Sequence, residues 1–201
     1  MVPGDLTKLK LYREVSIFNG TDLTGWRKLD EGYFDRPGEI RVEDGKLVLG
    51  KGDDLTGVCW KGEVQEENYE IAFQVRRVEG NDFFCGFTFP VEKSYVTLIL
   101  GGWGGYVVGL TAINGASAAE NSTTQGYDFK TGKWYEIRVS VTGKFIRVYR
   151  DLVKIIEVER EGNRFEVWPQ MEVARPLSFS TYDTVGEYRN IRYMRLGKLP
   201  E

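Results

Sequence analysis

Histidine is absent from the 201 residues of this sequence. Its absence excludes Ser-His-Asp and Cys-His catalysis, and every metal site that needs an imidazole ligand. Any acid–base chemistry must therefore come from Asp, Glu, Tyr, Lys or Cys. Cysteine is scarce as well, because Cys59 and Cys85 are the two in the chain. Both lie in apolar, strand-like runs, so we expect buried thiols, with a disulfide only if their strands are adjacent.

Clusters of one charge and long apolar runs are also missing. The net charge is −3 with both signs interspersed, and no block of Lys and Arg forms a phosphate track, which argues against binding to nucleic acid or anionic membranes. No apolar run approaches the roughly 20 residues that span a bilayer. Residues 1–15 lack the apolar core of a signal peptide. The protein is then intracellular, or a leader has been removed; the sequence leaves this and the oligomeric state open.

Glycine and aromatic residues are abundant instead, with 24 Gly, 11 Tyr, 11 Phe and 5 Trp. Short strand-like runs follow one another at regular intervals, and no segment shows a sustained helical period. Residues 69–76, for example, alternate between apolar and polar, and Asp44-Gly45 is a strong hairpin signal. The sequence thus predicts an all-β protein, with residues 1–201 forming a single β-sandwich domain of about a dozen strands.

The clearest hairpin lies within residues 133–150, and we expect Thr142-Gly143 to be its two-residue loop. The cross-strand pairs would then be Val141–Lys144, Val139–Ile146, Ile137–Val148 and Arg138–Arg147. Like charges placed directly opposite each other are destabilising. We therefore expect Glu136, another carboxylate, solvent or a ligand to compensate the two arginines.

Residues 101–124, GGWGGYVVGLTAINGASAAENSTT, form the most unusual segment. Glycine is weak in strands and usually marks a bend or a close approach. Trp103, held on such a flexed loop, would offer a flat apolar face to a ligand, and Asn114, Glu120 and Asn121 supply polar groups suited to hydroxyl-rich ligands. The alternative is an irregular crossover whose tryptophan packs into the core, because buried tryptophan is common.

Several motifs resemble one family over nearly the whole chain. SIFNGTDLTGW (16–26) resembles the LFNGKDLTGW opening of the DUF1080 family, the 3-keto-disaccharide hydrolase domain. Further similar segments are RVEDGKLVL (41–49), NYEIAFQVRR (68–77), GKWYEIRVSVTGKFIRVYRD (132–151) and YRNIRYMRL (188–196). The resemblance implies a concanavalin A-like jelly roll of two curved antiparallel sheets with a carbohydrate groove on the concave side, and chemistry on oxidised sugars in some members. In the central strand, Thr97 and hydrophobic residues replace the family's Glu and Asp.

One functional hypothesis is therefore a carbohydrate-active enzyme. Ordinary glycoside hydrolysis needs two carboxylates flanking the bond. A 3-keto sugar permits another route, in which a base removes the acidified C2 proton, the C1 substituent leaves and water then adds; this needs one base and a group that stabilises the enolate oxygen. Candidate bases are Glu120, Glu136 and Asp128, and Arg138 or Arg147 would stabilise the oxyanion.

The alternative is a non-catalytic carbohydrate-binding, lectin-like module. Aromatic platforms and polar groups would suffice for it, namely Trp103, Tyr106, Asn114, Asn121 and Arg138, with Arg147 on the same strand pair. A third hypothesis is a sandwich that mediates protein contacts, since a fold does not decide a function. We expect no cofactor. Calcium occurs often in this fold, but Asp53 and Asp54 are too few carboxylates for a typical site.

Overall fold

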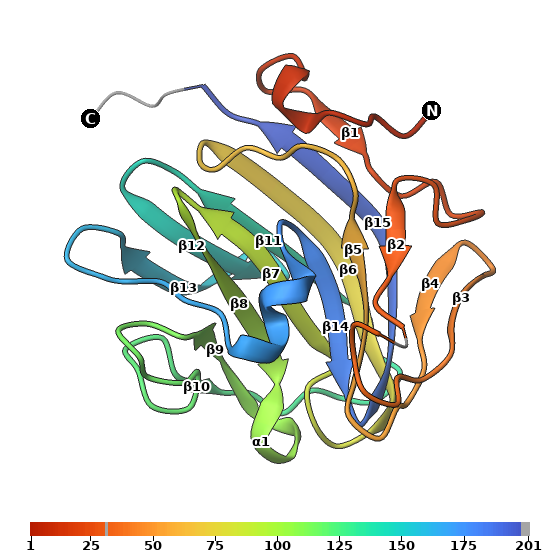
Figure 1. Ribbon diagram of the computed structural model, residues 1–201. Helices are drawn as coiled ribbons and strands as arrows, with labels where there is room; N and C mark the ends of the chain where they lie inside the picture. The colour runs from red at the N-terminus through yellow and green to blue at the C-terminus, as the bar shows by residue number, and fades with distance from the viewer. Residues whose placement is uncertain (31, 198–201) are drawn as a thin grey trace.

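Two antiparallel β-sheets stack face to face in the computed structural model, which describes residues 1–30 and 32–197 (Figure 1). One sheet has eight strands and the other seven. The helical elements of the described residues are a single turn, α1, and two 3-10 segments, η1 and η2. The prediction of an all-β jelly-roll sandwich is confirmed.

The eight-stranded sheet has the order β13-β12-β11-β6-β15-β4-β3, and β1 pairs with β15. Its strands are β1 (Glu14–Ser16), β3 (Ile40–Glu43), β4 (Lys46–Leu49), β6 (Tyr69–Gly80), β11 (Tyr135–Val141), β12 (Phe145–Arg150), β13 (Val153–Glu159) and β15 (Thr184–Arg195). The two longest strands, β6 and β15, pair in its centre. The C-terminal strand therefore lies between segments from the first half of the chain.

The seven-stranded sheet has the order β10-β9-β8-β7-β14-β5-β2. Its strands are β2 (Trp26–Lys28), β5 (Leu55–Trp60), β7 (Cys85–Val91), β8 (Ser94–Gly101), β9 (Val107–Thr111), β10 (Gln125–Gly126) and β14 (Ser178–Tyr182). The helical elements are η1 (Leu6–Lys8), α1 (Gly102–Gly105) and η2 (Pro169–Ala174). α1 follows β8 directly, so the glycine-rich segment opens at the end of a central strand.

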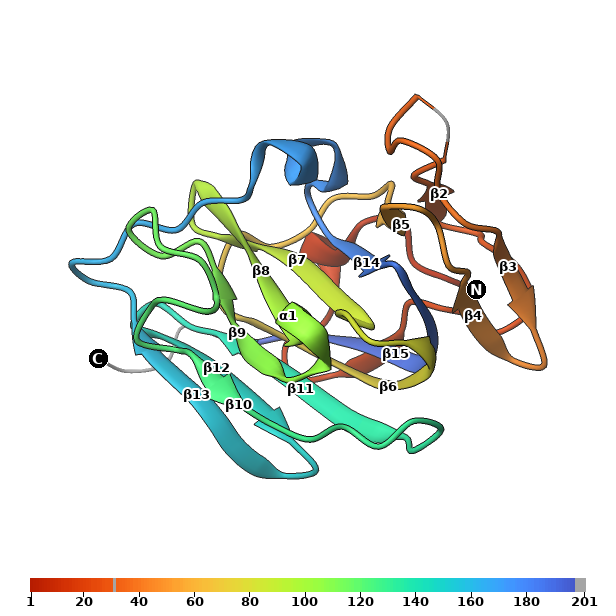
Figure 2. The same ribbon diagram turned by 90° about the horizontal axis from the view of Figure 1, so that it is seen from below.

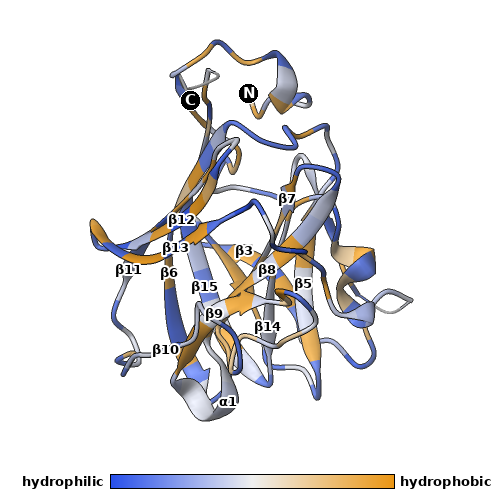
Figure 3. Cartoon of the chain, turned by 90° about the vertical axis from the view of Figure 1, so that its left-hand side faces the viewer, coloured by the Kyte–Doolittle hydropathy of each residue, from blue (hydrophilic) through white to orange (hydrophobic). Residues whose placement is uncertain are grey.

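Aromatic rings fill the space between the sheets. The ring centroid of Phe179 in β14 lies 4.8 Å from that of Phe73 in β6 and 4.9 Å from that of Tyr188 in β15. All three side chains are fully buried, and the Tyr188 hydroxyl donates to the Phe84 carbonyl oxygen at 2.8 Å. The predicted alternation of β6 is confirmed, since its apolar residues face this core. Colouring by hydropathy shows apolar strand segments in the interior and polar loops around them (Figure 3).

A second, smaller apolar cluster covers the outer face of the seven-stranded sheet. Residues 164–177, which include η2, cross this face, so that η2 lies on the side away from the eight-stranded sheet (Figure 2). Met171 and Ala174 from η2 pack there against residues such as Ile99 and Phe83. We call residues 164–177 the covering segment. The covering segment therefore buries part of the outer face of the seven-stranded sheet.

The predicted register of the β11–β12 hairpin is wrong by two residues. The structure pairs Val139 with Val148 and Arg138 with Tyr149. The loop is Gly143-Lys144, because the Thr142 amide donates to the Phe145 carbonyl and the Phe145 amide donates back to the Thr142 hydroxyl. Threonine thus closes the turn with its side chain instead of occupying the loop. A shift of two residues preserves the faces, so Arg138 and Arg147 share the outer face but lie diagonally.

Both thiols are free and buried, as expected. Cys59 in β5 and Cys85 in β7 lie on strands separated by β14, and they belong to the outer and inner apolar clusters respectively. A disulfide between them is therefore excluded by the strand order. Burial raises the pKa of both thiols above the ordinary value. Within residues 1–30 and 32–197, no helix has the length and apolarity needed to cross a membrane.

Candidate functional site

The turn that carries Trp103 has a left-handed backbone. Trp103 has a φ of 50°, and Gly104 and Gly105 follow with φ of 84° and 94°. This conformation costs a residue with a Cβ about 1–2 kcal/mol, which explains why glycines follow the tryptophan. The turn directs Trp103 away from the inter-sheet core, and its side chain is 43% exposed. Trp103 is therefore a surface residue on a strained, defined turn.

Arg77, near the end of β6, holds this turn in place. Arg77 is buried, with 8% of the residue exposed. It donates to the carbonyl oxygen of Gly105 at 3.4 Å and to that of Phe129 at 2.7 Å. A Cβ on Gly105 would lie 2.7 Å from Arg77 Nη1, so Gly105 is needed both for its backbone conformation and for this close approach.

Trp103 forms one wall of an aromatic cleft. Its ring lies edge-on to that of Trp168 in the covering segment, with centroids 5.9 Å apart and planes at 67°. A hollow of about 260 Å³ between them is completed by Asp82, Phe83 and Tyr182. Tyr182 is 39% exposed and lies beside the buried ring of Phe83. We call this hollow the Trp103–Trp168 cleft.

Two further hollows adjoin Trp168. A small pocket of about 80 Å³ extends beneath it, between the seven-stranded sheet and η2, and shares Phe83, Trp168 and Tyr182 with the cleft. On the other side of Trp168, a hollow of about 430 Å³ is lined by Tyr95 and Arg175, among other residues. The Arg175 guanidinium lies 5.0 Å from the Tyr95 ring centroid. Trp168 borders all three spaces, so it is the residue that they have in common.

Beneath the cleft and the covering segment runs a row of hydroxyl side chains. The strand registers place Ser178 beside Thr88, Thr88 beside Thr97, and Thr97 beside Thr111, across β14, β7, β8 and β9. All four residues are at least 99% buried. The Thr88 and Thr97 hydroxyl oxygens are 2.8 Å apart and hydrogen-bonded. Position 97, where the resembled family carries an acidic residue, therefore presents a bonded alcohol.

The other residues singled out in the glycine-rich segment lie outside the Trp103–Trp168 cleft. Asn121 donates to the carbonyl oxygens of Leu110 and Ser117, and Asn114 links its loop to residues 163–164 through two hydrogen bonds. These amides stabilise loops. Tyr106 is 55% exposed and covers Gly126, where a Cβ would overlap its ring.

Glu120 and Asp128 are exposed carboxylates with local partners. Glu120 accepts a hydrogen bond from the Ser117 hydroxyl at 2.7 Å, and Asp128 is ion-paired with Lys130. Neither residue lines any of the hollows described here.

Glu136, Arg138 and Arg147 come together on the opposite side of the molecule. They line a hollow of about 320 Å³ on the outer face of the eight-stranded sheet, together with Glu70, Ser140, Thr142, Tyr149 and Leu152. Each has an oppositely charged partner: Glu136 pairs with Arg192, Arg138 with Glu70, and Arg147 with Glu157. The sequence-predicted residues thus divide between two faces separated by the core.

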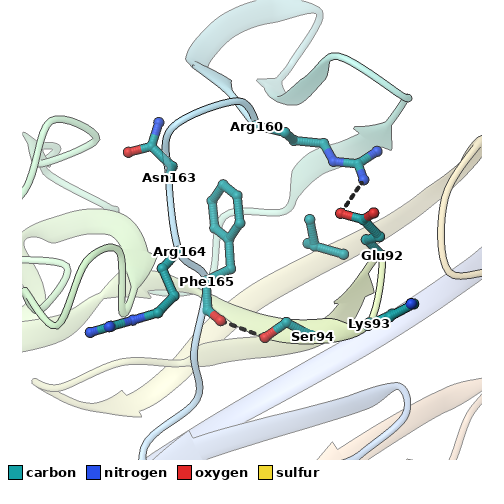
Figure 4. A pocket seen from close by; sticks show the side chains of 8 residues that line it. Glu92, Lys93, Ser94, Arg160, Asn163, Arg164 and Phe165 are labelled. Atoms are coloured by element: carbon teal, nitrogen blue, oxygen red, sulfur yellow. Dashed lines mark hydrogen bonds and ion pairs between the residues drawn. The ribbon is translucent and has the colours of Figure 1, made fainter.

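A polar pocket of about 340 Å³ lies at the end of the β7–β8 hairpin (Figure 4). Its buried charge, Arg160, is bonded to Glu67, to Glu92 and to the Thr142 carbonyl oxygen. The Ser94 hydroxyl donates to the Phe165 carbonyl at the pocket floor. The Ser94–Phe165 bond fastens the start of the covering segment to the hairpin, and Arg160 already has three partners in the protein.

Sequence reasoning missed Trp168, Phe83, Tyr182 and Asp82. Trp168 lies in EVWPQ, next to Val167 and Pro169 and two residues from Glu166 and Gln170. An aromatic residue in such surroundings was the available signal for a surface ring. Phe83 and Tyr182 lie far apart in sequence, and strand pairing brings them together because the Tyr182 amide donates to the Phe83 carbonyl.

The described residues contain no group of three or more acidic, cysteine or histidine side chains that could hold a metal ion. Asp53, one of the two calcium candidates, is ion-paired with Arg36 at 2.8 Å. Asp54 instead lines the small pocket beneath Trp168. The two adjacent carboxylates thus have different surroundings.

The 3-keto-alpha-glucoside-1,2-lyase-like domain matches residues 13–194. The chain belongs to this family. It is accordingly a carbohydrate-active protein, and the resemblance drawn from its motifs is confirmed. No curated protein sequence matches the chain.

Solved structures share the fold at low sequence identity. A Bacillus subtilis protein of unknown function with a galectin-like fold superposes with a TM-score of 0.63 and 10% identity, over 94% of this chain and 97% of that one. Domain 4 of AbnA, a GH43 extracellular arabinanase from Geobacillus stearothermophilus solved with arabinotriose, gives 0.55 and 18%, over 92% and 93%. The carbohydrate-binding module CBM66 from Bacillus subtilis gives 0.53 and 12%, over 84% and 94%.

Proposed function

We propose that this chain binds carbohydrate without transforming it, in the Trp103–Trp168 cleft. The observation that carries the proposal is the half-exposed Trp103 ring held edge-on to Trp168 on a rigid turn. Ligand sites combine apolar and aromatic walls with a few placed polar groups. A sugar ring has the matching chemistry, because its C–H face packs on an aromatic ring while its hydroxyls reach groups such as the Asp82 carboxylate.

The sheet beneath the cleft favours binding over catalysis. Base-promoted elimination from a 3-keto sugar needs a carboxylate or another base close to C2. The carboxylate that lines the cleft, Asp82, accepts a hydrogen bond from the Phe83 amide at 2.7 Å. The central strand presents Thr97, whose alcohol is bonded to Thr88 and is no base near neutral pH. Met171 from the covering segment packs against this face, which removes further room for a substrate.

The relatives agree with this ligand class. One structural neighbour is a carbohydrate-binding module, and another was solved with arabinotriose. At 12% and 18% identity, the likeness to these structures supports the fold alone.

The test is calorimetry and a glycan array with the purified chain. Trp103→Ala and Trp168→Ala should each weaken glycan binding at least about tenfold, since stacked rings dominate such contacts. Tyr106→Ala is the matched control, because it removes an aromatic ring that is also exposed but lies outside the cleft. Thermal melting should show that the Trp103 variant remains folded. An array without any bound glycan, or equal losses for all three variants, would refute the proposal.

A second candidate is elimination on a 3-keto glycoside in the hollow of the eight-stranded sheet. It is favoured by one observation, that Glu136, Arg138 and Arg147 line the same space. We propose Glu136 as the base and Arg138 as the group that would stabilise the enolate oxygen. Incubation with a 3-keto glycoside should then release the C1 substituent, and Glu136→Gln should abolish the release while Glu120→Gln leaves it intact. An inactive wild type rules this candidate out.

A further inference from the structure

The small pocket beneath Trp168 combines two kinds of wall. Its apolar side chains are Leu55, Phe83, Ile99 and Met171, and its polar ones are Asp54, Thr97, Thr111 and Gln170. It adjoins the Trp103–Trp168 cleft, with which it shares Phe83, Trp168 and Tyr182. A substituent on a ring bound in the cleft would reach it by passing between these three side chains.

Thr111 distinguishes this pocket from an ordinary packing gap. The residue is 1% exposed, and its hydroxyl oxygen has no hydrogen-bond partner among the described residues. Leaving a buried hydroxyl unpaired is unfavourable by about 1–3 kcal/mol. The neighbouring Thr97 hydroxyl is bonded to Thr88 and makes no bond to Thr111. A ligand group that can pair with this hydroxyl would recover that free energy.

We propose that this pocket receives the acetamido group of an N-acetylated sugar whose ring lies in the cleft. The inference rests on the proposed carbohydrate-binding function. The acetyl methyl would pack against Ile99 and Met171, and the acetamido carbonyl would accept a hydrogen bond from Thr111. The Asp54 carboxylate supplies an acceptor for the N–H. A pocket of about 80 Å³ suits a group of a few heavy atoms, given that one water occupies about 30 Å³ in the liquid.

Other common sugar substituents match only half of these walls. The methyl group of a 6-deoxy sugar would cover the apolar side chains but leave the Thr111 hydroxyl unpaired. A hydroxyl would pair with Thr111 but leave Ile99 and Met171 against a polar group. The acetamido group alone among these offers a methyl, an acceptor and a donor within one planar unit.

The experiment compares methyl glycosides that differ at a single position. N-acetylglucosamine is paired with glucose, and N-acetylgalactosamine with galactose, in titrations followed by saturation-transfer NMR. The N-acetylated member of at least one pair should bind about tenfold more tightly or better, as one buried hydrogen bond and a packed methyl would give. Its acetyl methyl should also receive the strongest saturation.

Two variants separate the pocket from general effects. Thr111→Val keeps the shape, removes the hydroxyl and should erase most of the tenfold preference, while glucose or galactose binding stays unchanged. Ser178→Ala is the matched control, because its hydroxyl is equally buried and unpartnered but does not line the pocket. It should leave the preference intact. Melting temperatures confirm that both variants are folded.

The failures of the two proposals look different. Equal binding within each pair, or a preference that survives Thr111→Val, overturns the acetamido assignment and leaves the cleft as a carbohydrate site. No binding of any methyl glycoside, together with an empty glycan array, defeats the proposed function and this inference with it.

Discussion

Thr88 and Thr97 face each other across β7 and β8, with their hydroxyl oxygens 2.8 Å apart and both side chains buried beneath the covering segment. Each hydroxyl serves as the hydrogen-bond partner of the other, so neither requires water or a charged side chain as a partner. Together with Ser178 and Thr111 they make a polar row across four strands. Of this row, Thr97 and Thr111 line the small pocket beneath Trp168, whereas Thr88 and Ser178 do not.

This pairing predicts a coupled effect on stability. Thr97→Val should lower the free energy of unfolding by about 1–2 kcal/mol, because it leaves the buried Thr88 hydroxyl without a partner. The double variant Thr88→Val/Thr97→Val should cost less than the sum of the two single variants, since two apolar groups of similar shape then face each other. Urea denaturation of the four proteins measures the coupling, and simple additivity would contradict it.

The corrected register of the β11–β12 hairpin leaves its two faces as the sequence predicted. Ile137 is fully buried in the core, so Ile137→Ala should destabilise the protein by about 2–5 kcal/mol. Arg147 lies on the outer face in an ion pair with Glu157, and Arg147→Ala should cost at most about 1 kcal/mol. Chemical denaturation would reverse this order if the faces were exchanged.

Arg77 should control the position of Trp103. Arg77→Met leaves the Gly105 and Phe129 carbonyls without their donor, and we expect a loss of about 1–3 kcal/mol in stability. Release of the turn should also shift the tryptophan emission to longer wavelength. Repeating the measurement in a Trp103→Phe background isolates the signal of this ring. Arg77→Lys, which retains one donor, should recover part of the shift; an unchanged spectrum would disconnect Arg77 from the turn.

Burial of the thiols predicts a loss of stability in alkaline solution. The pKa of Cys85 is raised by desolvation, so the unfolded chain releases this proton near pH 8.5 while the native protein retains it. Stability from this group is complete below that pH and falls as the pH rises, by about 1.4 kcal/mol per unit. Denaturation between pH 8.5 and 10 should show the slope, and Cys85→Ala should reduce it.

The same burial makes both thiols unreactive in the native state. Cys59 lies under η2, where its Sγ donates to the Arg175 carbonyl at 3.1 Å. A thiol reagent should therefore modify neither cysteine until denaturant is added. Rapid modification of native Cys59 would show that the covering segment opens.

The two-residue alternation of apolar and polar side chains, together with the turn residues, made the strands predictable. The alternation of residues 69–76 and the Asp44-Gly45 turn act over a few neighbours, and both are found in the structure. The register of the β11–β12 hairpin was not predictable from loop propensity alone, because the Thr142 hydroxyl closes the turn by accepting from the Phe145 amide and donating to the Phe145 carbonyl.

The cleft was only partly accessible from sequence. Glycines around Trp103 indicated a surface ring, and the ring is 43% exposed. Its partner Trp168 comes from a segment whose path over the sheet depends on long-range contacts, such as the Arg27 guanidinium donating to the Val173 carbonyl. Local patterns carry no information about such docking. For the same reason, the sequence could not reveal that Glu120 lies apart from Glu136.

The covering segment limits which substitutions could introduce an acid–base group on the face of the sheet beneath it. A carboxylate restored at position 97 would be desolvated, beside Thr88 and Thr111 and close to Met171, and an isolated buried carboxylate is strongly disfavoured. The single substitution Thr97→Glu would therefore unfold or distort the site before it could act as a base. η2 would have to move away from the sheet before a carboxylate at position 97 could be solvated. An acid–base site on this face therefore requires a backbone rearrangement in addition to the point mutation.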